Sequence, residues 1–357
     1  MAASATAREQ RKQLSDQRRK VDFDSYDVTV DELLRRVERN RIDIAPIYQR
    51  QFRWLAPRQS RLIESVLLGI PVPPLFMATN RLDDVRSQWE VVDGLQRLLT
   101  LVNFAGDQRA RDGGLLTGTP LILEEMEKLT CLEGFSFTEL PEDIRTGFED
   151  RPVKVIVLND KSDLEVRFDL FERLNTGGIN LTPQEIRECV FRGEFIDLLG
   201  RCASTAEFRT VVALPDSRWK DGTPEDFVLR FFAFYETYNE FSHSVKGFLN
   251  DFARSGHDNP RIAERQKYFD DTFRFLVKCF PEGLKTRKGQ TPVNLFEAVS
   301  VGAAFALQNR PNLKPVASTD WVNSPKLRAL VTGATNSRPR VRGRIEYCRD
   351  RFLGINA

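Results

Sequence analysis

Apolar residues in the first half of the chain recur with helical spacing in some stretches and in short strand-like runs in others. Turn and capping residues separate these stretches. The predicted elements are a helix opened by a capping box at Thr29 and Glu32, a short strand at 41–44, a helix from Pro57 to Gly69, a strand in IPVPPLFMA, a strand at 89–94 followed by a helix, and a buried strand at 154–158.

Beyond residue 160 the pattern is almost entirely helical. One expected helix is capped by Ser162 and Glu165. Further helices are expected from Thr182 to Gly193, from Thr223 through Tyr235, and around 261–280 and 293–307. The predicted class is therefore α+β. Its expected parts are a basic, flexible or loosely helical N-terminus at 1–22, a mixed α/β domain at 23–160, a helical domain at 161–325 and a basic segment at 326–357.

Composition is ordinary for a globular protein: 357 residues with 41% hydrophobic and 29% charged side chains. No apolar run reaches the roughly 20 residues of a membrane span, and the N-terminus lacks the apolar centre of a secretory signal. Five scattered cysteines without CxxC spacing favour ordinary reduced thiols over a zinc site. We expect a cytoplasmic protein.

Histidine is scarce, with only His243 and His257 in the chain. Neither lies beside residues that would complete a metal site or a nucleophilic triad. The low histidine count therefore argues against three classes of site: an HNH nuclease, a Ser-His-Asp hydrolase and a histidine-rich metal centre.

The segment WEVVDGLQRLL predicts a strand, a sharp turn at Asp93 and Gly94, and a helix. A helix that begins there points free N–H groups and the positive end of its dipole into the turn, which favours an anion. Gly94 leaves the backbone accessible, and Gln96 and Arg97 can add hydrogen bonds and charge. The alternative is an ordinary turn and cap with a solvated arginine.

Two further motifs carry candidate residues. IYQRQFRW, from Ile47 to Trp54, places aromatic rings beside guanidinium groups, as a base-and-phosphate site requires. Read alone, it is better explained as a half-buried edge segment. FERLNTGGINLTPQE contains a Gly-Gly turn in which Arg173 and Asn175 are the chemical residues, but on local evidence a plain corner between helices explains it better.

Net charge is only +2, yet basic residues gather near both ends of the chain. Within SRPRVRGRIEYCRDR, a polyanion such as DNA could be held by Arg338, Arg340, Arg342 and Arg344. A solvated helix face would have the same composition, so both interpretations stay open.

Taken in order, IYQRxFxW, IPVPPLF, VVDGxQRL and FxRLNTGGxxLTPQE resemble one family, from about Tyr26 to about Gly193. The chain resembles the N-terminal domain of GmrSD-type restriction endonucleases, within the ParB/sulfiredoxin-like superfamily. The resemblance implies a ParB/sulfiredoxin-like fold for the domain at 23–160, followed by helices.

The resemblance also implies a nucleotide site at the DGLQR turn. Asp93 and Arg97 would be its catalytic residues, with Asp93 orienting water or a Mg²⁺ ion. The remaining nucleotide-binding residues would be Tyr48, Gln49, Arg50, Trp54, Gly94, Gln96 and Asn175. Which nucleoside triphosphate binds is left open, and no resident metal site is expected. Sulfiredoxin needs a cysteine in this turn, whereas this chain has Leu95, Gln96 and Arg97, so sulfinate reductase activity is excluded.

The predicted function is that of a nucleotide-binding and NTP-hydrolysing component that senses DNA in a bacterial anti-phage or restriction system, without an HNH nuclease domain of its own. The alternative is a non-catalytic DNA-binding or scaffold module that recruits or regulates a partner nuclease. Direct nuclease activity is disfavoured because no metal-ligand constellation is present. Expected partners are a nucleotide, DNA and a partner nuclease or defence-system subunit, and no membrane.

Overall fold

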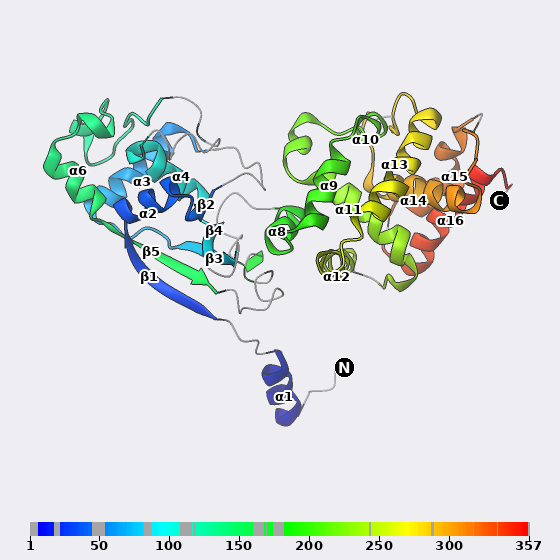
Figure 1. Cartoon of the computed structure of the whole chain (residues 1–357), viewed down its shortest axis with the longest axis horizontal. Helices are drawn as coiled ribbons and strands as arrows, with labels where there is room; N and C mark the ends of the chain where they lie inside the picture. Colours follow the sequence, from blue (N-terminus) through cyan, green and yellow to red (C-terminus); the bar gives the residue numbers. More distant parts are fainter. Residues whose placement is uncertain are drawn as a thin grey trace. The chain divides into compact units, whose positions relative to one another are not determined.

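The computed structural model describes residues 6–17, 22–44, 54–81, 87–107, 116, 119–159, 168, 170, 172–173, 182–242, 244–286, 289–316, 318–333 and 335–355. The chain divides into two compact units, Met1–Asn180 and Leu181–Ala357. Figure 1 shows strands and helices together in the first unit and helices in the second. The α+β class predicted from the sequence is confirmed.

Unit 1 contains a five-stranded mixed sheet in the order β1-β5-β3-β4-β2. The pairs β1/β5 and β3/β4 are antiparallel, and the pairs β3/β5 and β2/β4 are parallel. The strands are β1 (Phe23–Thr29), β2 (Ile42–Asp43), β3 (Leu75–Arg81), β4 (Ser87–Asp93) and β5 (Pro152–Leu158). The helices are α1 (Ala7–Gln17), α2 (Val30–Glu38), α3 (Ala56–Leu68), α4 (Leu95–Ala105) and α6 (Glu142–Glu149), with 3₁₀ turns at Thr130–Leu132 and Phe137–Glu139.

The sheet is strongly curved. Tyr26 of β1 stacks on Trp89 of β4 with ring centroids 5.8 Å apart, although β5 and β3 lie between these strands in the sheet order. In a flat sheet the two strands would be about 14 Å apart, at about 4.8 Å per strand. The curvature therefore brings β1 and the start of β4 together over one face.

The predicted helix after Thr29 is confirmed, and its capping explains where it starts. The Thr29 side chain accepts a hydrogen bond from the Glu32 backbone N–H, and the buried stripe is Val30, Leu33, Leu34 and Val37. The expected capping box is incomplete, because the Glu32 carboxylate binds Arg36 instead. Strand β1 was not predicted, since its side chains are exposed at most positions and show no apolar alternation.

Glu64 organises part of the stretch between Gly106 and Pro152, for which no helix or strand is predicted from the sequence. Its buried carboxylate accepts backbone N–H groups from Lys128 at 2.6 Å, Leu129 at 2.8 Å and Glu127 at 3.3 Å. Burial raises the pKa of Glu64, but these backbone hydrogen bonds outweigh it, and the pKa is lowered overall. One side chain of α3 thus fixes a turn more than sixty residues away in the sequence.

In the described residues of unit 2, the regular elements are all helices. Its α-helices are α8 (Pro183–Val190), α9 (Glu194–Ala203), α10 (Ala206–Val211), α11 (Thr223–Thr237), α12 (Val245–Asp258), α13 (Ile262–Cys279), α14 (Val293–Asn309), α15 (Pro325–Val331) and α16 (Arg338–Leu353). Short 3₁₀ helices lie at Asp216–Lys220, Tyr238–Glu240 and Asp320–Asn323. Helix α14 is buried along most of its length and forms the centre of this unit.

The helices predicted at 223–235, 261–280 and 293–307 are confirmed. The capping box at Thr182 and Glu185 is complete, but that helix ends at Val190, not at Gly193. Gly193, with φ +140°, is instead the N-cap residue of the next helix, α9, which begins at Glu194. The helix predicted after Ser162 falls mostly outside the described residues. The basic segment at 326–357 contains α15 and α16, and α16 buries Val341, Ile345, Cys348 and Phe352.

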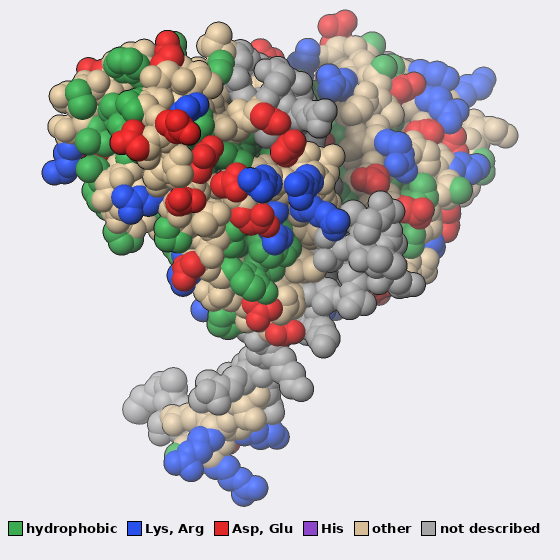
Figure 2. Space-filling model, turned by 60° about the vertical axis from the view of Figure 1, so that its left-hand side comes forward, with side chains coloured by type: hydrophobic (Ala, Val, Ile, Leu, Met, Phe, Trp, Pro, Cys, Tyr) green, Lys and Arg blue, Asp and Glu red, His purple; other side chains and the backbone are tan. Residues whose placement is uncertain are grey.

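Charged side chains of both signs are interspersed over the visible surface of unit 1 in Figure 2. Across the described residues, no helix is both long and apolar enough to cross a membrane. The same described residues contain no group of three or more His, Cys, Asp or Glu side chains that could hold a metal ion.

Candidate functional site

The DGLQR turn has the strand–turn–helix geometry that the sequence predicts. Strand β4 ends at Asp93, Gly94 is the N-cap residue with φ +95°, and α4 begins at Leu95. A Cβ on residue 94 would lie 2.6 Å from Cδ2 of Leu75 and 2.9 Å from Nη2 of Arg97. Glycine is thus favoured by the left-handed backbone, and a Cβ there would also displace the ends of the Leu75 and Arg97 side chains.

The first turn of α4 has no side-chain cap. The first helical hydrogen bond runs from the Leu98 N–H to the Gly94 carbonyl. The N–H groups of Leu95 and Arg97 precede it, and an α-helix offers them no partner of its own. They contribute the positive end of the helix dipole at the turn.

Arg97 folds back over this helix N-terminus. Its Nη2 donates to Oδ2 of Asp93 at 2.8 Å and to the Pro74 carbonyl at 3.0 Å. The Arg97 side chain is 18% exposed and that of Asp93 is 40% exposed. The Nε of Arg97 is buried and has no hydrogen-bond partner among the described residues. A permanent positive charge therefore lies at the turn, partly covered, with unused hydrogen-bonding capacity.

Gln96 is held by the segment that leads into α3. Its Oε1 accepts the backbone N–H of Trp54 at 3.2 Å, while Gln59 donates to the Trp54 carbonyl at 2.8 Å. Asn103 donates in turn to Oε1 of Gln59 at 2.9 Å. The structure thus joins the end of the IYQRQFRW motif to the DGLQR helix, which no local pattern in the sequence indicated.

Trp54 lies at the edge of this network, with the guanidinium carbon of Arg58 4.5 Å from the centroid of its ring. Five of the residues expected at the nucleotide site are thereby brought together: Trp54, Asp93, Gly94, Gln96 and Arg97. The other four lie outside the described residues: Tyr48, Gln49, Arg50 and Asn175. Their predicted part in the pocket stays a prediction.

Of the four C-terminal arginines, Arg338 and Arg342 are exposed, Arg340 is half-buried and Arg344 is buried. Arg338 donates to the Asn239 carbonyl, Arg340 to the carbonyls of Ala329 and Thr332, and Arg342 pairs with Glu346 at 2.8 Å.

Arg344 corrects the prediction made from its position in the basic segment. Its side chain is 0% exposed and forms a buried ion pair with Glu297 of α14. Its Nη1 donates to the Thr335 carbonyl at 3.1 Å. Buried inside the helical unit, this guanidinium is not accessible to a polyanion, because the inward face of α16 points it at α14.

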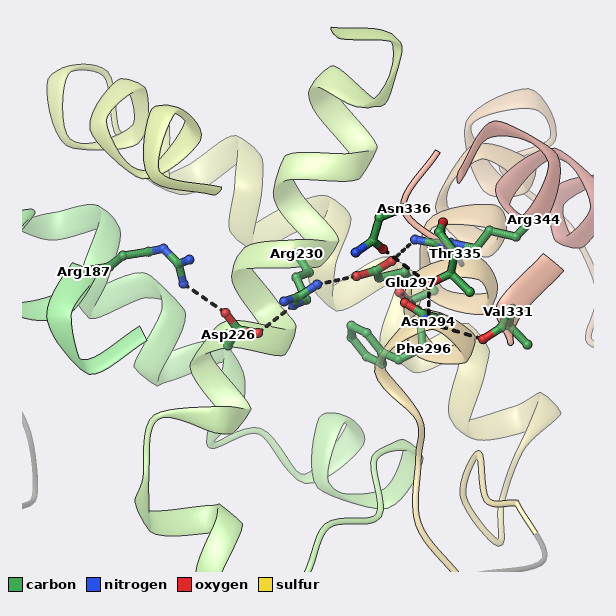
Figure 3. Close-up of polar contacts among 11 residues, drawn as sticks. Arg187, Asp226, Arg230, Asn294, Phe296, Glu297, Val331, Thr335, Asn336 and Arg344 are labelled. Carbon is green, nitrogen blue, oxygen red and sulfur yellow. Dashed lines mark hydrogen bonds and ion pairs between the residues drawn. The ribbon is translucent and has the colours of Figure 1, made fainter. Parts of the chain in front are cut away.

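Arg344 is one end of a chain of ion pairs that sequence reasoning missed (Figure 3). Arg187 lies 3.0 Å from Asp226, Asp226 lies 2.6 Å from Arg230, and Arg230 lies 2.7 Å from Glu297. The chain joins helices α8, α11, α14 and α16. The available signal was a charged residue, Glu297, within an otherwise apolar helix.

The polar face of α8 extends this buried network. Glu188 accepts a hydrogen bond from Gln184 at 3.1 Å, and Arg187 donates to Asn250 at 2.9 Å. Desolvation, with Glu225 nearby, raises the pKa of Glu188 well above its usual value. Burial also lowers the pKa of Arg187, against the opposing effect of Asp226. These groups are bound to one another, so we interpret them as structural.

Comparison with known families identifies the part of the chain that contains the turn. Residues 30–192 match the GmrSD restriction endonuclease, N-terminal domain, so this segment belongs to that family. The match confirms the resemblance noted between about Tyr26 and about Gly193, and the domain suggests a component of a restriction or defence system. It extends past unit 1 through α8. A comparison with curated proteins found no match.

Proposed function

We propose that this protein binds a nucleoside triphosphate at the DGLQR turn, hydrolyses it, and couples this step to the sensing of DNA within its restriction system. The observation that carries the proposal is the convergence of a helix N-terminus without a side-chain cap, Gly94 and the half-buried guanidinium of Arg97, whose Nε has no hydrogen-bond partner among the described residues. Anionic phosphates suit this combination, because helix N–H groups and a guanidinium both donate to phosphate oxygens.

The proposed roles follow from the positions of the side chains. Arg97 would exchange its bond to Asp93 for phosphate oxygens, since a partly exposed ion pair is held only weakly. Asp93, released and 40% exposed, would orient the attacking water or a Mg²⁺ ion bound with the nucleotide. Gln96 would act indirectly by holding the backbone of Trp54.

The proposal is tested by phosphate release from ATP, GTP, CTP and UTP, each with and without duplex DNA. We expect release by the wild type, stimulation by DNA, and a loss of at least about tenfold in Arg97→Ala and Arg97→Lys, because lysine lacks the planar fork. Arg61→Ala, at an exposed arginine paired with Glu127, is the matched control and should keep full activity. Absence of nucleotide binding by calorimetry for all four nucleotides would refute the proposal.

A second candidate is a non-catalytic DNA-binding or scaffold module that recruits a partner nuclease. It is favoured by the arrangement of Arg97, whose Nη2 is engaged by both Asp93 and the Pro74 carbonyl. In that case Arg97 has a structural role and only holds the turn between β4 and α4 in place. Duplex binding would then survive Asp93→Ala, and no phosphate release would be measured from the wild type.

A further inference from the structure

A hollow of about 350 Å³ lies on unit 1 away from the DGLQR residues, and its lining is dominated by arginine. The lining residues are Glu32, Arg35, Arg36, Arg39, Arg41 and Trp89. Its volume corresponds to about twelve water molecules at roughly 30 Å³ each. The hollow is thus too large for one bare ion and suits an extended, hydrated anion.

The backbone beneath two of these arginines is fixed. Asn40 takes φ +53°, and α2 ends in hydrogen bonds from the N–H groups of Arg39, Asn40 and Arg41 to carbonyls of the preceding turn. Strand β4 then holds this turn from the side. Gln88 donates to the Asn40 carbonyl at 2.7 Å, and the Trp89 N–H donates to the Arg41 carbonyl at 2.9 Å. A rigid frame therefore presents the arginines on either side of Asn40.

The four guanidinium groups differ in how they are engaged. Arg35 pairs with Asp31 at 3.0 Å and Arg36 with Glu32 at 2.7 Å, each one helical turn away. Arg39 and Arg41 are exposed and have no carboxylate partner among the described residues. Two uncompensated positive charges thus lie at the hollow, beside two whose carboxylate partners are part-exposed and easily exchanged.

Trp89 determines which part of a nucleic acid fits. Its ring stacks with Tyr26, and the guanidinium carbon of Arg36 lies 4.3 Å from its centroid. Because these neighbours already engage the ring, it is not placed to stack on a base. The remaining chemistry is that of guanidinium forks, which match phosphate oxygens in geometry and charge.

We infer that this arginine-lined hollow binds the phosphodiester backbone of DNA without reading its bases. The inference rests on the DNA-sensing role proposed above but not on nucleotide hydrolysis. It moves the DNA contact from the C-terminal arginines to α2 and the turn before β2. Backbone contacts of this kind position a protein on a duplex and make its affinity depend on salt.

The test is fluorescence anisotropy of a labelled duplex of about 20 base pairs with the full-length protein, without nucleotide, at salt concentrations from about 50 to 200 mM. In the double variant Arg39→Gln/Arg41→Gln, we expect Kd at about 100 mM salt to rise at least tenfold. The slope of log K against log salt should become shallower by about 0.9 for each phosphate that the variant no longer neutralises. The control Arg338→Gln/Arg342→Gln removes the same charge from α16 and should bind as the wild type does.

The inference would be overturned by no duplex binding by the wild type, by unchanged affinity and slope in the Arg39/Arg41 variant, or by an equal weakening in the α16 control. Binding of inorganic triphosphate that depends on Arg39 and Arg41, without duplex binding, would also overturn it. Phosphate release without DNA separates the two proposals, since the Arg39/Arg41 variant should keep it and Arg97→Ala should lose it while still binding the duplex.

Discussion

Nη2 of Arg97 lies 2.8 Å from Oδ2 of Asp93, and the same nitrogen donates to the Pro74 carbonyl at 3.0 Å. One guanidinium thus connects the end of β4, the start of α4 and the residue that leads into β3. Such a link holds the turn in shape before any ligand arrives. Whether a phosphate replaces Asp93 at this guanidinium separates the nucleotide-hydrolysing function from the binding module.

Gly94→Ala should destabilise unit 1 by about 1–3 kcal/mol, because alanine is strained at φ +95° and its Cβ would meet Leu75 at 2.6 Å. Thermal unfolding monitored by circular dichroism measures the effect. Gly147→Ala is the control: residue 147 lies inside α6, and its Cβ would have no neighbour within 4 Å. That change should stabilise by about 0.5–1 kcal/mol. Equal effects from both substitutions would contradict the geometry assigned to the turn.

Arg344→Met should cost about 3–5 kcal/mol of folding free energy, because it removes one partner of a fully buried ion pair. Arg342→Met, two residues earlier on the same helix, removes an arginine that is 63% exposed and should cost less than about 1 kcal/mol. Urea unfolding of the two variants gives the comparison. If Arg344→Met unfolds at the same urea concentration as the wild type and binds duplex DNA more weakly, the prediction that Arg344 contacts DNA would be restored.

Glu188→Gln should stabilise the protein increasingly as the pH rises through and above the range in which an ordinary glutamate titrates. Burial, with Glu225 nearby, raises the pKa of Glu188, so the folded state binds a proton that the unfolded state has released above the ordinary glutamate pKa. The wild type therefore loses stability over this range, while glutamine keeps a polar group for the Gln184 amide and does not ionise. Melting temperatures measured across the range report the difference. Glu142→Gln, at an exposed glutamate, should show no such trend; a pH-independent effect of Glu188→Gln would argue against the buried proton.

Much of unit 1 was predictable because its signals are local. The Thr29 cap, the αL glycine at the end of β4 and the alternation of Val153, Val155 and Val157 depend on neighbours within a few residues. Strand β1 was missed because it is held by pairing with β5, more than a hundred residues away, and not by an apolar pattern of its own. The end of α8 was misplaced because Gly193 favours the start of α9 as well as it favours a stop.

The candidate site likewise has features that follow from local sequence and features that depend on distant parts of the chain. Sequence by itself determined the class, the family segment and the turn at Asp93–Arg97, since a glycine turn followed by an amphipathic helix is a contiguous signal. Only the tertiary structure decided that Gln96 holds Trp54, that Arg344 is buried against Glu297, and that Arg39 and Arg41 flank a hollow with Trp89. The physical reason is that the environment of an arginine depends on which carboxylates and carbonyls the fold brings to it, and these partners come from distant parts of the chain.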